Sequence, residues 1–153
     1  MNGLLSFQEA LSQQLITPRP GQFNSSLSVM EDNPNGELRI THARIVAEEV
    51  HGTVMYCVVD PVDLIPCFSV GYAVSEERRR QGVGATLLQE SIEELRRKMF
   101  RVGVKDFYIE AIVGINNVAS NGLATKILAR DPVSTTDKVS GEPAFQYLKR
   151  IKE

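Results

Sequence analysis

The clearest pattern of apolar and polar positions lies in the middle of the chain. Apolar side chains recur there at intervals of four, three and four residues, at Leu88, Ile92, Leu95 and Met99. This spacing predicts one buried face of a helix that begins near 82–85. The polar face carries charges spaced for two surface ion pairs, Glu93 with Arg97 and Glu94 with Lys98.

Two shorter helices are predicted on either side. Near the N-terminus, Ser6 and Glu9 form a capping-box pattern inside an apolar stripe that runs from Leu4 to Leu15. A further helix is expected over 118–129, after a turn at 114–117, and Asp131-Pro132 should end it.

Runs of β-branched and aromatic residues predict the strands. Segments 37–50 and 53–59 should pair antiparallel with a turn near His51-Gly52, and further strands are expected at 68–74, 106–113 and 144–151. Prolines, glycines and polar residues predict turns over 17–36, with one brief strand at 27–30, and loops at 60–66 and 134–143.

This order of elements predicts the fold class. Helix, strands, helix, strand, helix and strand follow one another, which favours an α/β fold with a mixed, mostly antiparallel central sheet flanked by helices. With 153 residues, 42% of them hydrophobic, the chain is expected to form a single domain over 1–153.

Composition narrows the function classes. A net charge of −2 argues against a broad nucleic-acid surface. Two cysteines, Cys57 and Cys67, and two histidines show no metal-ligand spacing, so we expect no metal and two reduced thiols. The N-terminus lacks the features of a signal peptide and no apolar run reaches the length of a membrane span, which predicts a cytoplasmic protein.

The junction between the strand at 68–74 and the long helix carries the candidate chemistry. Gly82 and Gly84 allow several backbone N–H groups to point at one anion near the positive end of the helix, which predicts a phosphate cradle. A dinucleotide fingerprint would need glycine where Leu87 stands. A P-loop would need Lys-Ser or Lys-Thr where Ala85-Thr86 follows.

The residues that do fit are 79–84, Arg-Arg-Gln-Gly-Val-Gly. They match an Arg/Gln-x-x-Gly-x-Gly/Ala signature, and the chain thereby resembles the GNAT superfamily of N-acetyltransferases, which bind acetyl-CoA. The strand, asparagine turn and helix over 109–128 resemble the block that follows in the family. The Asn-x-x-Ser at 117–120 is similar to branches that include N-terminal acetyltransferases of ribosomal proteins.

The resemblance implies a GNAT-like fold and a set of acetyl-CoA contacts. Backbone N–H groups of 80–85 would hold the pyrophosphate, and the backbone of 72–74 would pair with the pantetheine arm in a slot between two splayed strands. The expected contact residues are Tyr72, Ala73, Val74, Arg79, Arg80, Gln81, Gly82, Val83, Gly84, Ala85, Asn117 and Ser120. Asn117 is equally suited to capping its helix, and the arginines to a solvated charge run.

Two residues are candidates for proton transfer. Glu110, in the middle of a strand, is either a general base acting through water or a carboxylate on a solvated face. Tyr147 would protonate the departing thiolate or would pack in the core. Many family members carry a tyrosine as general acid where this chain has Ala124, so the proton must come from elsewhere.

The predicted function is therefore an enzyme that moves the acetyl group of acetyl-CoA directly to an amine. The acceptor is either a protein N-terminus or a small amine such as a polyamine, which Glu48, Glu49 and Glu110 could attract. The missing helix tyrosine leaves one competing class, a non-catalytic acyl-CoA-binding sensor or interaction module. Similar proteins commonly form homodimers, although no residue here specifies an interface.

Overall fold

A computed structural model describes residues 2–153. It has three α-helices, α1 (Asn2–Ser12), α2 (Val83–Arg101) and α3 (Val118–Ile127), and two 3-10 turns, η1 (Pro34–Gly36) and η2 (Glu76–Arg78). The strands are β1 (Arg19–Pro20), β2 (Ser28–Asp32), β3 (Arg39–Val46), β4 (Glu49–Val62), β5 (Ile65–Val74), β6 (Asp106–Gly114), β7 (Val133–Thr136) and β8 (Pro143–Lys152).

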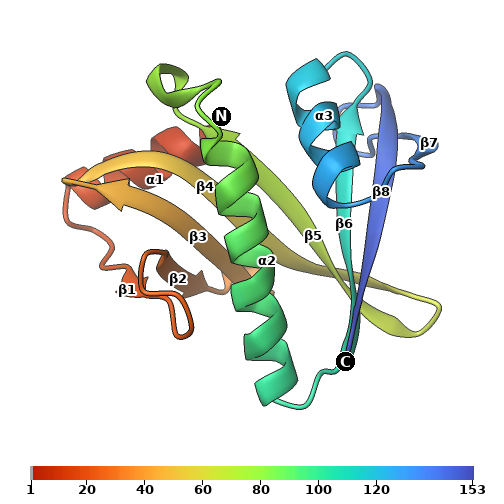
Figure 1. The fold of residues 1–153 in the computed structure, drawn as a ribbon, viewed down its shortest axis with the longest axis horizontal. Helices are drawn as coiled ribbons and strands as arrows, with labels where there is room; N and C mark the ends of the chain where they lie inside the picture. Colours follow the sequence, from red (N-terminus) through yellow and green to blue (C-terminus); the bar gives the residue numbers. More distant parts are fainter. Residues whose placement is uncertain (1) are drawn as a thin grey trace.

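All eight strands form one sheet in the order β1-β2-β3-β4-β5-β6-β8-β7 (Figure 1). Every neighbouring pair is antiparallel except β5 and β6. The predicted mixed, mostly antiparallel sheet is confirmed. The parallel pairing is short, from Cys67–Tyr108 to Ser69–Glu110. Beyond Ser69 and Glu110 the two strands diverge, as the resemblance implies (Figure 1).

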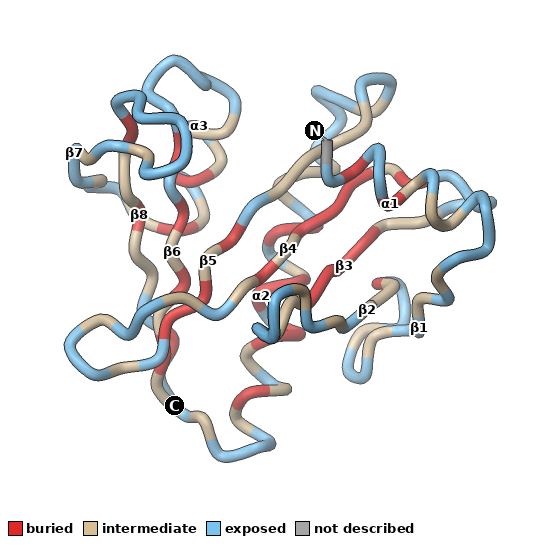
Figure 2. The backbone as a smooth tube through the Cα atoms, turned by 180° about the vertical axis from the view of Figure 1, so that it is seen from behind, coloured by how far each residue is buried: buried red, intermediate tan, exposed pale blue. Residues whose placement is uncertain are grey.

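Helices cover both faces of the sheet unequally. The larger core lies beneath α2 and α3, and it includes the predicted helix face of Leu88, Ile92, Leu95 and Met99. A smaller cluster, with Leu4 and Phe7 of α1 against Ala43 and Val50, lies on the opposite face (Figure 2). The back of β6 and β8 has no helix over it (Figure 2).

The first helix begins earlier than predicted. Because α1 starts at Asn2, Ser6 lies inside the helix and cannot be its N-cap, so the capping-box prediction is wrong. Leu15 lies beyond the helix end and is 73% exposed, so it does not extend the apolar stripe.

One predicted hairpin turns earlier than expected, and one predicted loop is instead a tight hairpin. The β3–β4 turn is at Ala47-Glu48 rather than His51-Gly52, and residues 60–66 belong to a β4–β5 hairpin that turns at Asp63-Leu64. All four turn residues have positive φ, between 49° and 68°. Positive φ at both central residues is the geometry that suits two-residue hairpins. Residues 133–136 also form an edge strand where a loop was predicted, because they pair with β8.

One of the two predicted ion pairs on α2 is wrong. Glu93 and Arg97 do pair, at 3.2 Å. Glu94 is only 3% exposed, and its carboxylate accepts backbone N–H groups of residues 22, 23 and 24 at 2.8, 3.0 and 2.9 Å. Lys98 pairs with Glu31. Glu94 therefore connects the segment before β2 to the middle of α2 by hydrogen bonds.

Candidate active site

A cavity of about 710 Å³ lies where β5, the loop before α2 and the first turns of α3 meet. Eleven of the twelve residues predicted to contact acetyl-CoA line it, although they come from three separate segments of the chain. The exception is Gln81, whose amide donates to the Glu77 carbonyl at 3.1 Å. Three lining residues were not predicted: Arg78, Ala119 and Leu123.

The two loop glycines serve different purposes. Gly82 is the N-cap of α2 and has a φ of 79°, a backbone angle that residues other than glycine rarely adopt. At Gly84, a Cβ would lie 3.1 Å from Leu123 Cδ1 and 3.2 Å from Val74 Cγ2. Gly84 therefore lets α2 approach the end of β5 and the side of α3 closely.

The start of α2 is suited to an anion. Gly82 supplies no capping side chain, so the N–H groups of the first turn have no side-chain acceptor from the N-cap. The positive end of the helix dipole adds to their attraction for negative charge. Three arginines, Arg78, Arg79 and Arg80, line the same cavity. The residues present thus fit the pyrophosphate of acetyl-CoA.

Tyr72 reaches across the slot with its side chain. Its hydroxyl donates to the Ser120 carbonyl at 2.7 Å, which joins β5 to α3. Burial, with a smaller contribution from nearby Tyr147, raises the pKa of Tyr72 to about 12. The sequence implied only a backbone role for this residue, because its phenol becomes relevant only once α3 is placed beside β5.

Asn117 caps α3, as one interpretation of the sequence expected. Its side-chain oxygen accepts the N–H of Ser120 at 3.1 Å. Both residues also line the cavity, so a cap and a ligand contact are compatible at this position.

Glu110 and Tyr147 lie on opposite faces of the sheet. The neighbours of Glu110, Ile109 and Ala111, belong to the core under the helices, so Glu110 points to the back face. It is half-buried at the last paired position before β5 and β6 diverge. There it accepts a 2.6 Å hydrogen bond from Gln146. Glu110 is therefore close to the base of the slot, on the side away from the cavity.

Tyr147 is 1% exposed beneath α3 and does not line the cavity. Its hydroxyl donates to Asn121 Oδ1 at 2.7 Å. The Asn121 amide donates in turn to the carbonyls of Gly114 and Asn117, both at 2.9 Å. This network orients the turn before α3, which is the packing role that the sequence left open. Ala124, where the family tyrosine would stand, is fully buried.

Beside the loop lies a polar cluster that sequence reasoning missed. Glu49 contacts Arg78 Nη2 at 3.5 Å and His51 Nε2 at 3.9 Å. Three buried polar atoms here have no hydrogen-bond partner among residues 2–153: His51 Nε2, Ser75 Oγ and Arg78 Nε. The cluster joins β4, β5 and η2, so only their contact in three dimensions reveals it.

The sequence matches a known protein family. The sequence profile described as the acetyltransferase (GNAT) family matches residues 9–129. The chain belongs to this family. Membership confirms the predicted enzyme class, an acetyl-CoA-dependent N-acetyltransferase. A search of curated protein sequences finds no match.

Solved GNAT structures share the fold. A GNAT acetyltransferase from Streptococcus pneumoniae matches with a TM-score of 0.55 at 16% identity, over 74% of this chain and 66% of its own. A ribosomal-protein-alanine N-acetyltransferase from Brucella melitensis gives 0.53 at 20% identity, over 75% and 69%. Arabidopsis thaliana NAA60, in complex with a bisubstrate analogue, gives 0.52 at 13%, over 74% and 75%. This chain thus spans about two thirds to three quarters of each.

Residues 2–153 contain neither a metal-binding cluster nor a membrane-spanning helix. No group of three or more His, Cys, Asp or Glu side chains is placed to hold a metal ion there. Among the helices of the same residues, none has both the length and the apolar character needed to cross a membrane.

Proposed function

We propose that this chain transfers the acetyl group of acetyl-CoA to the α-amine of a protein N-terminus. The observation that carries the proposal is the gathering of eleven predicted contact residues, from three segments, around one cavity. The protein acceptor is supported by the Asn-x-x-Ser at the start of α3 and by similarity in fold to a ribosomal-protein-alanine N-acetyltransferase. Two free thiols support a cytoplasmic location.

In this proposal the N–H groups of 80–85 hold the pyrophosphate and the backbone of 72–74 pairs with the pantetheine arm. Acetyl-CoA supplies the acetyl thioester. An N–C bond forms to the acceptor amine as the C–S bond breaks, the amine loses a proton, and the thiolate gains one. The protein's task is to bind and orient both reactants and to move these two protons.

Glu110 is placed to take up the proton of the acceptor through water. It lies at the base of the slot on the back face, where β6 and β8 have no helix over them, so the acceptor can approach from that side. An α-amine has a pKa of roughly 8, against about 10.4 for lysine, so its nitrogen needs little help from a base.

Tyr72 is the proposed proton donor to the thiolate. It is the tyrosine whose side chain lines the cavity, and its raised pKa keeps it protonated at neutral pH. Tyr147, the donor expected from the sequence, is 1% exposed beneath α3 and does not line this cavity. Comparing Tyr72→Phe with Tyr147→Phe therefore decides which tyrosine acts.

A small polycation is less well accommodated as acceptor. Glu49, one of the carboxylates expected to attract it, lies between Arg78 and His51. Its charge is therefore balanced by a residue of the acetyl-CoA cavity itself.

Turnover on matched peptides tests the acceptor class. One peptide set has a free N-terminus and no lysine. The second set differs from the first in two respects: its N-termini are acetylated, and one internal residue of each peptide is replaced by lysine. Mass spectrometry measures the acetylation of both sets, and we expect only the first set to be acetylated. Acetylation of the lysine peptides alone, or of polyamines alone, contradicts the proposed acceptor, and binding of acetyl-CoA without any turnover contradicts the enzyme.

A further inference from the structure

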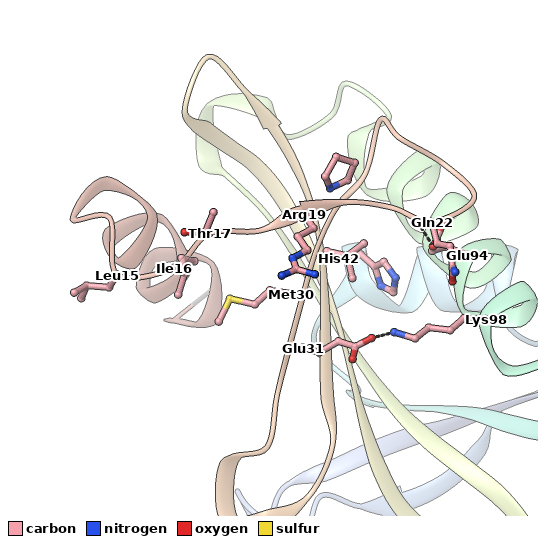
Figure 3. Close-up of a pocket in the computed structure, with 12 residues that line it drawn as sticks. Leu15, Ile16, Thr17, Arg19, Gln22, Met30, Glu31, His42, Glu94 and Lys98 are labelled. Carbon is pink, nitrogen blue, oxygen red and sulfur yellow. Dashed lines mark hydrogen bonds and ion pairs between the residues drawn. The ribbon is translucent and has the colours of Figure 1, made fainter. Parts of the chain in front are cut away.

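A second cavity, of about 560 Å³, lies at the other end of the sheet (Figure 3). Segment 15–22, strands β2 and β3, and the middle of α2 enclose it, and none of its lining residues also lines the acetyl-CoA cavity. Its volume falls within the range of about 300–1,000 Å³ typical of small-molecule sites. It is therefore large enough for a ligand of its own.

Both carboxylates on its wall already have partners. Glu31 pairs with Lys98 (Figure 3). The Glu94 carboxylate accepts the three backbone N–H groups of 22–24. Arg19, in contrast, makes no side-chain hydrogen bond or ion pair with any residue of 2–153. The cavity thus presents one uncommitted positive charge.

His42 provides a buried polar group on the floor. It is 1% exposed, and its ring packs edge-on against Tyr56 with 5.6 Å between the ring centroids. Its Nδ1 has no hydrogen-bond partner in the described part of the chain. Burial lowers the pKa of His42 to about 4, so the ring is neutral at pH 7. A buried polar atom without a partner costs free energy, and a ligand that bonded the imidazole would recover part of it.

Apolar side chains form one part of the wall. Leu15, Ile16, Val29 and Met30 contribute aliphatic and thioether surface. Of these, Met30 lies close to Arg19 (Figure 3). A guanidinium, a neutral imidazole and this apolar surface together complement a molecule with one anionic end and an aliphatic body.

We propose that this cavity binds a small aliphatic carboxylic acid, with its carboxylate at Arg19 and within reach of His42, and its body against the apolar side chains of the wall. Because the two cavities share no lining residue, this site is separate from acetyl transfer, and the two proposals can fail independently.

The chain offers a direct spectroscopic test, because it contains only two histidines. In protein labelled on the histidine rings, His42 reports on this cavity, whereas His51 lies beside Arg78 of the acetyl-CoA cavity. The probe is 4-methylpentanoate, and its neutral isostere 4-methylpentanamide is the control. We expect the acid to shift the His42 signals saturably, with a dissociation constant on the order of 1 mM. The amide should bind at least about tenfold more weakly.

Substitutions localise the binding. Arg19 is exposed, so Arg19→Gln should fold normally and weaken binding of the acid at least about tenfold. Arg130→Gln, an equal change of charge at an exposed position after α3, should leave it unchanged. The proposal is overturned if the His42 signals do not move, if acid and amide bind alike, or if Arg19→Gln binds the acid as the parent protein does. The response of His51 to acetyl-CoA reports separately on the acetyl-CoA site.

Discussion

At the scale of single residues, the site depends on which tyrosine hydroxyl reaches the slot. Ala124 removes the family's usual proton donor from α3. Tyr72 carries a hydroxyl to the neighbouring turn of that helix from the opposite side, because it extends from β5 to the carbonyl of Ser120. The proposed donor is thus supplied by a strand instead of a helix.

We predict that Tyr72→Phe lowers kcat by about 100-fold, within the usual contribution of a general acid. The KM for acetyl-CoA should change little, because the ring remains. Since the pKa of Tyr72 is raised to about 12, the phenol stays protonated below that pH, and kcat should show no loss of this acid up to about pH 11. Steady-state kinetics over this range measure both effects.

Tyr147→Phe is the matched control. It removes a buried hydrogen bond to Asn121 and should lower the free energy of unfolding by about 1 kcal/mol. If it abolishes turnover while Tyr72→Phe does not, the assignment of the donor is wrong.

His42 should make stability depend on pH. Its pKa is lowered by burial from 6.5 to about 4 in the folded protein. Between these values the unfolded chain binds more protons, so the free energy of unfolding falls as the pH drops, by about 3 kcal/mol in all. Urea unfolding at pH 7 and pH 4.5 should show this loss, and His42→Gln should remove it. His51→Gln should retain it; an unchanged slope in His42→Gln would contradict the assignment.

At the scale of elements, the loop between β5 and α2 requires close contact at Gly84. A methyl group there would lie within 3.2 Å of Val74 and Leu123. We predict that Gly84→Ala pushes α2 away from α3 and weakens acetyl-CoA binding about tenfold, as measured by calorimetry. Gly122→Ala, inside α3 with nothing within 4 Å of the added methyl, should instead stabilise the protein by about 0.5–1 kcal/mol. Equal affinities in the two variants would argue against the close-approach explanation.

Glu94 should control the segment before β2. Its carboxylate holds three N–H groups of residues 22–24, and hydrogen bonds to charged groups contribute about 1.5–3 kcal/mol each. We predict that Glu94→Gln lowers stability by about 2 kcal/mol and speeds hydrogen exchange of these N–H groups. Glu93→Gln, which alters an exposed ion pair on the same helix, should cost less than about 1 kcal/mol. Unchanged exchange in Glu94→Gln would show that the segment is held by other contacts.

Elements with strong local signals could be predicted from the sequence. The face of α2 from Leu88 to Met99 follows from periodicity, and the loop at 79–84 from its glycines and arginines. The hairpin turn at Ala47-Glu48 could not be predicted, because neither residue is typical of positive φ. Glu94 was misassigned because its partners lie about 70 residues away, so its spacing to Lys98 suggested a pair that does not form.

At the scale of the whole molecule, two cavities lie along the same sheet, each beside a different part of α2. The parallel pairing of β5 and β6 ends at Ser69 and Glu110, and the cavity proposed to bind acetyl-CoA lies between the end of β5, the start of α2 and the start of α3. The Arg19–His42 cavity lies toward the β1–β2 edge, beside the middle of α2. Motif residues led from the sequence to the first site, whereas the second assembles from residues with no common motif and appears only in the folded protein.

The start of α2 is proposed to hold the pyrophosphate of acetyl-CoA. Ala85 lines the cavity in the first turn of α2, where a glutamate favours the helix but places negative charge in the cradle. Calorimetric titration of acetyl-CoA into the parent protein, Ala85→Gln and Ala85→Glu tests it, with unfolding curves to confirm that all three are folded. We predict that the parent protein and Ala85→Gln bind acetyl-CoA. The affinity of Ala85→Glu for acetyl-CoA should be at least about tenfold lower than that of Ala85→Gln. Equal binding by the glutamine and glutamate variants, or no binding by the parent protein, would contradict it.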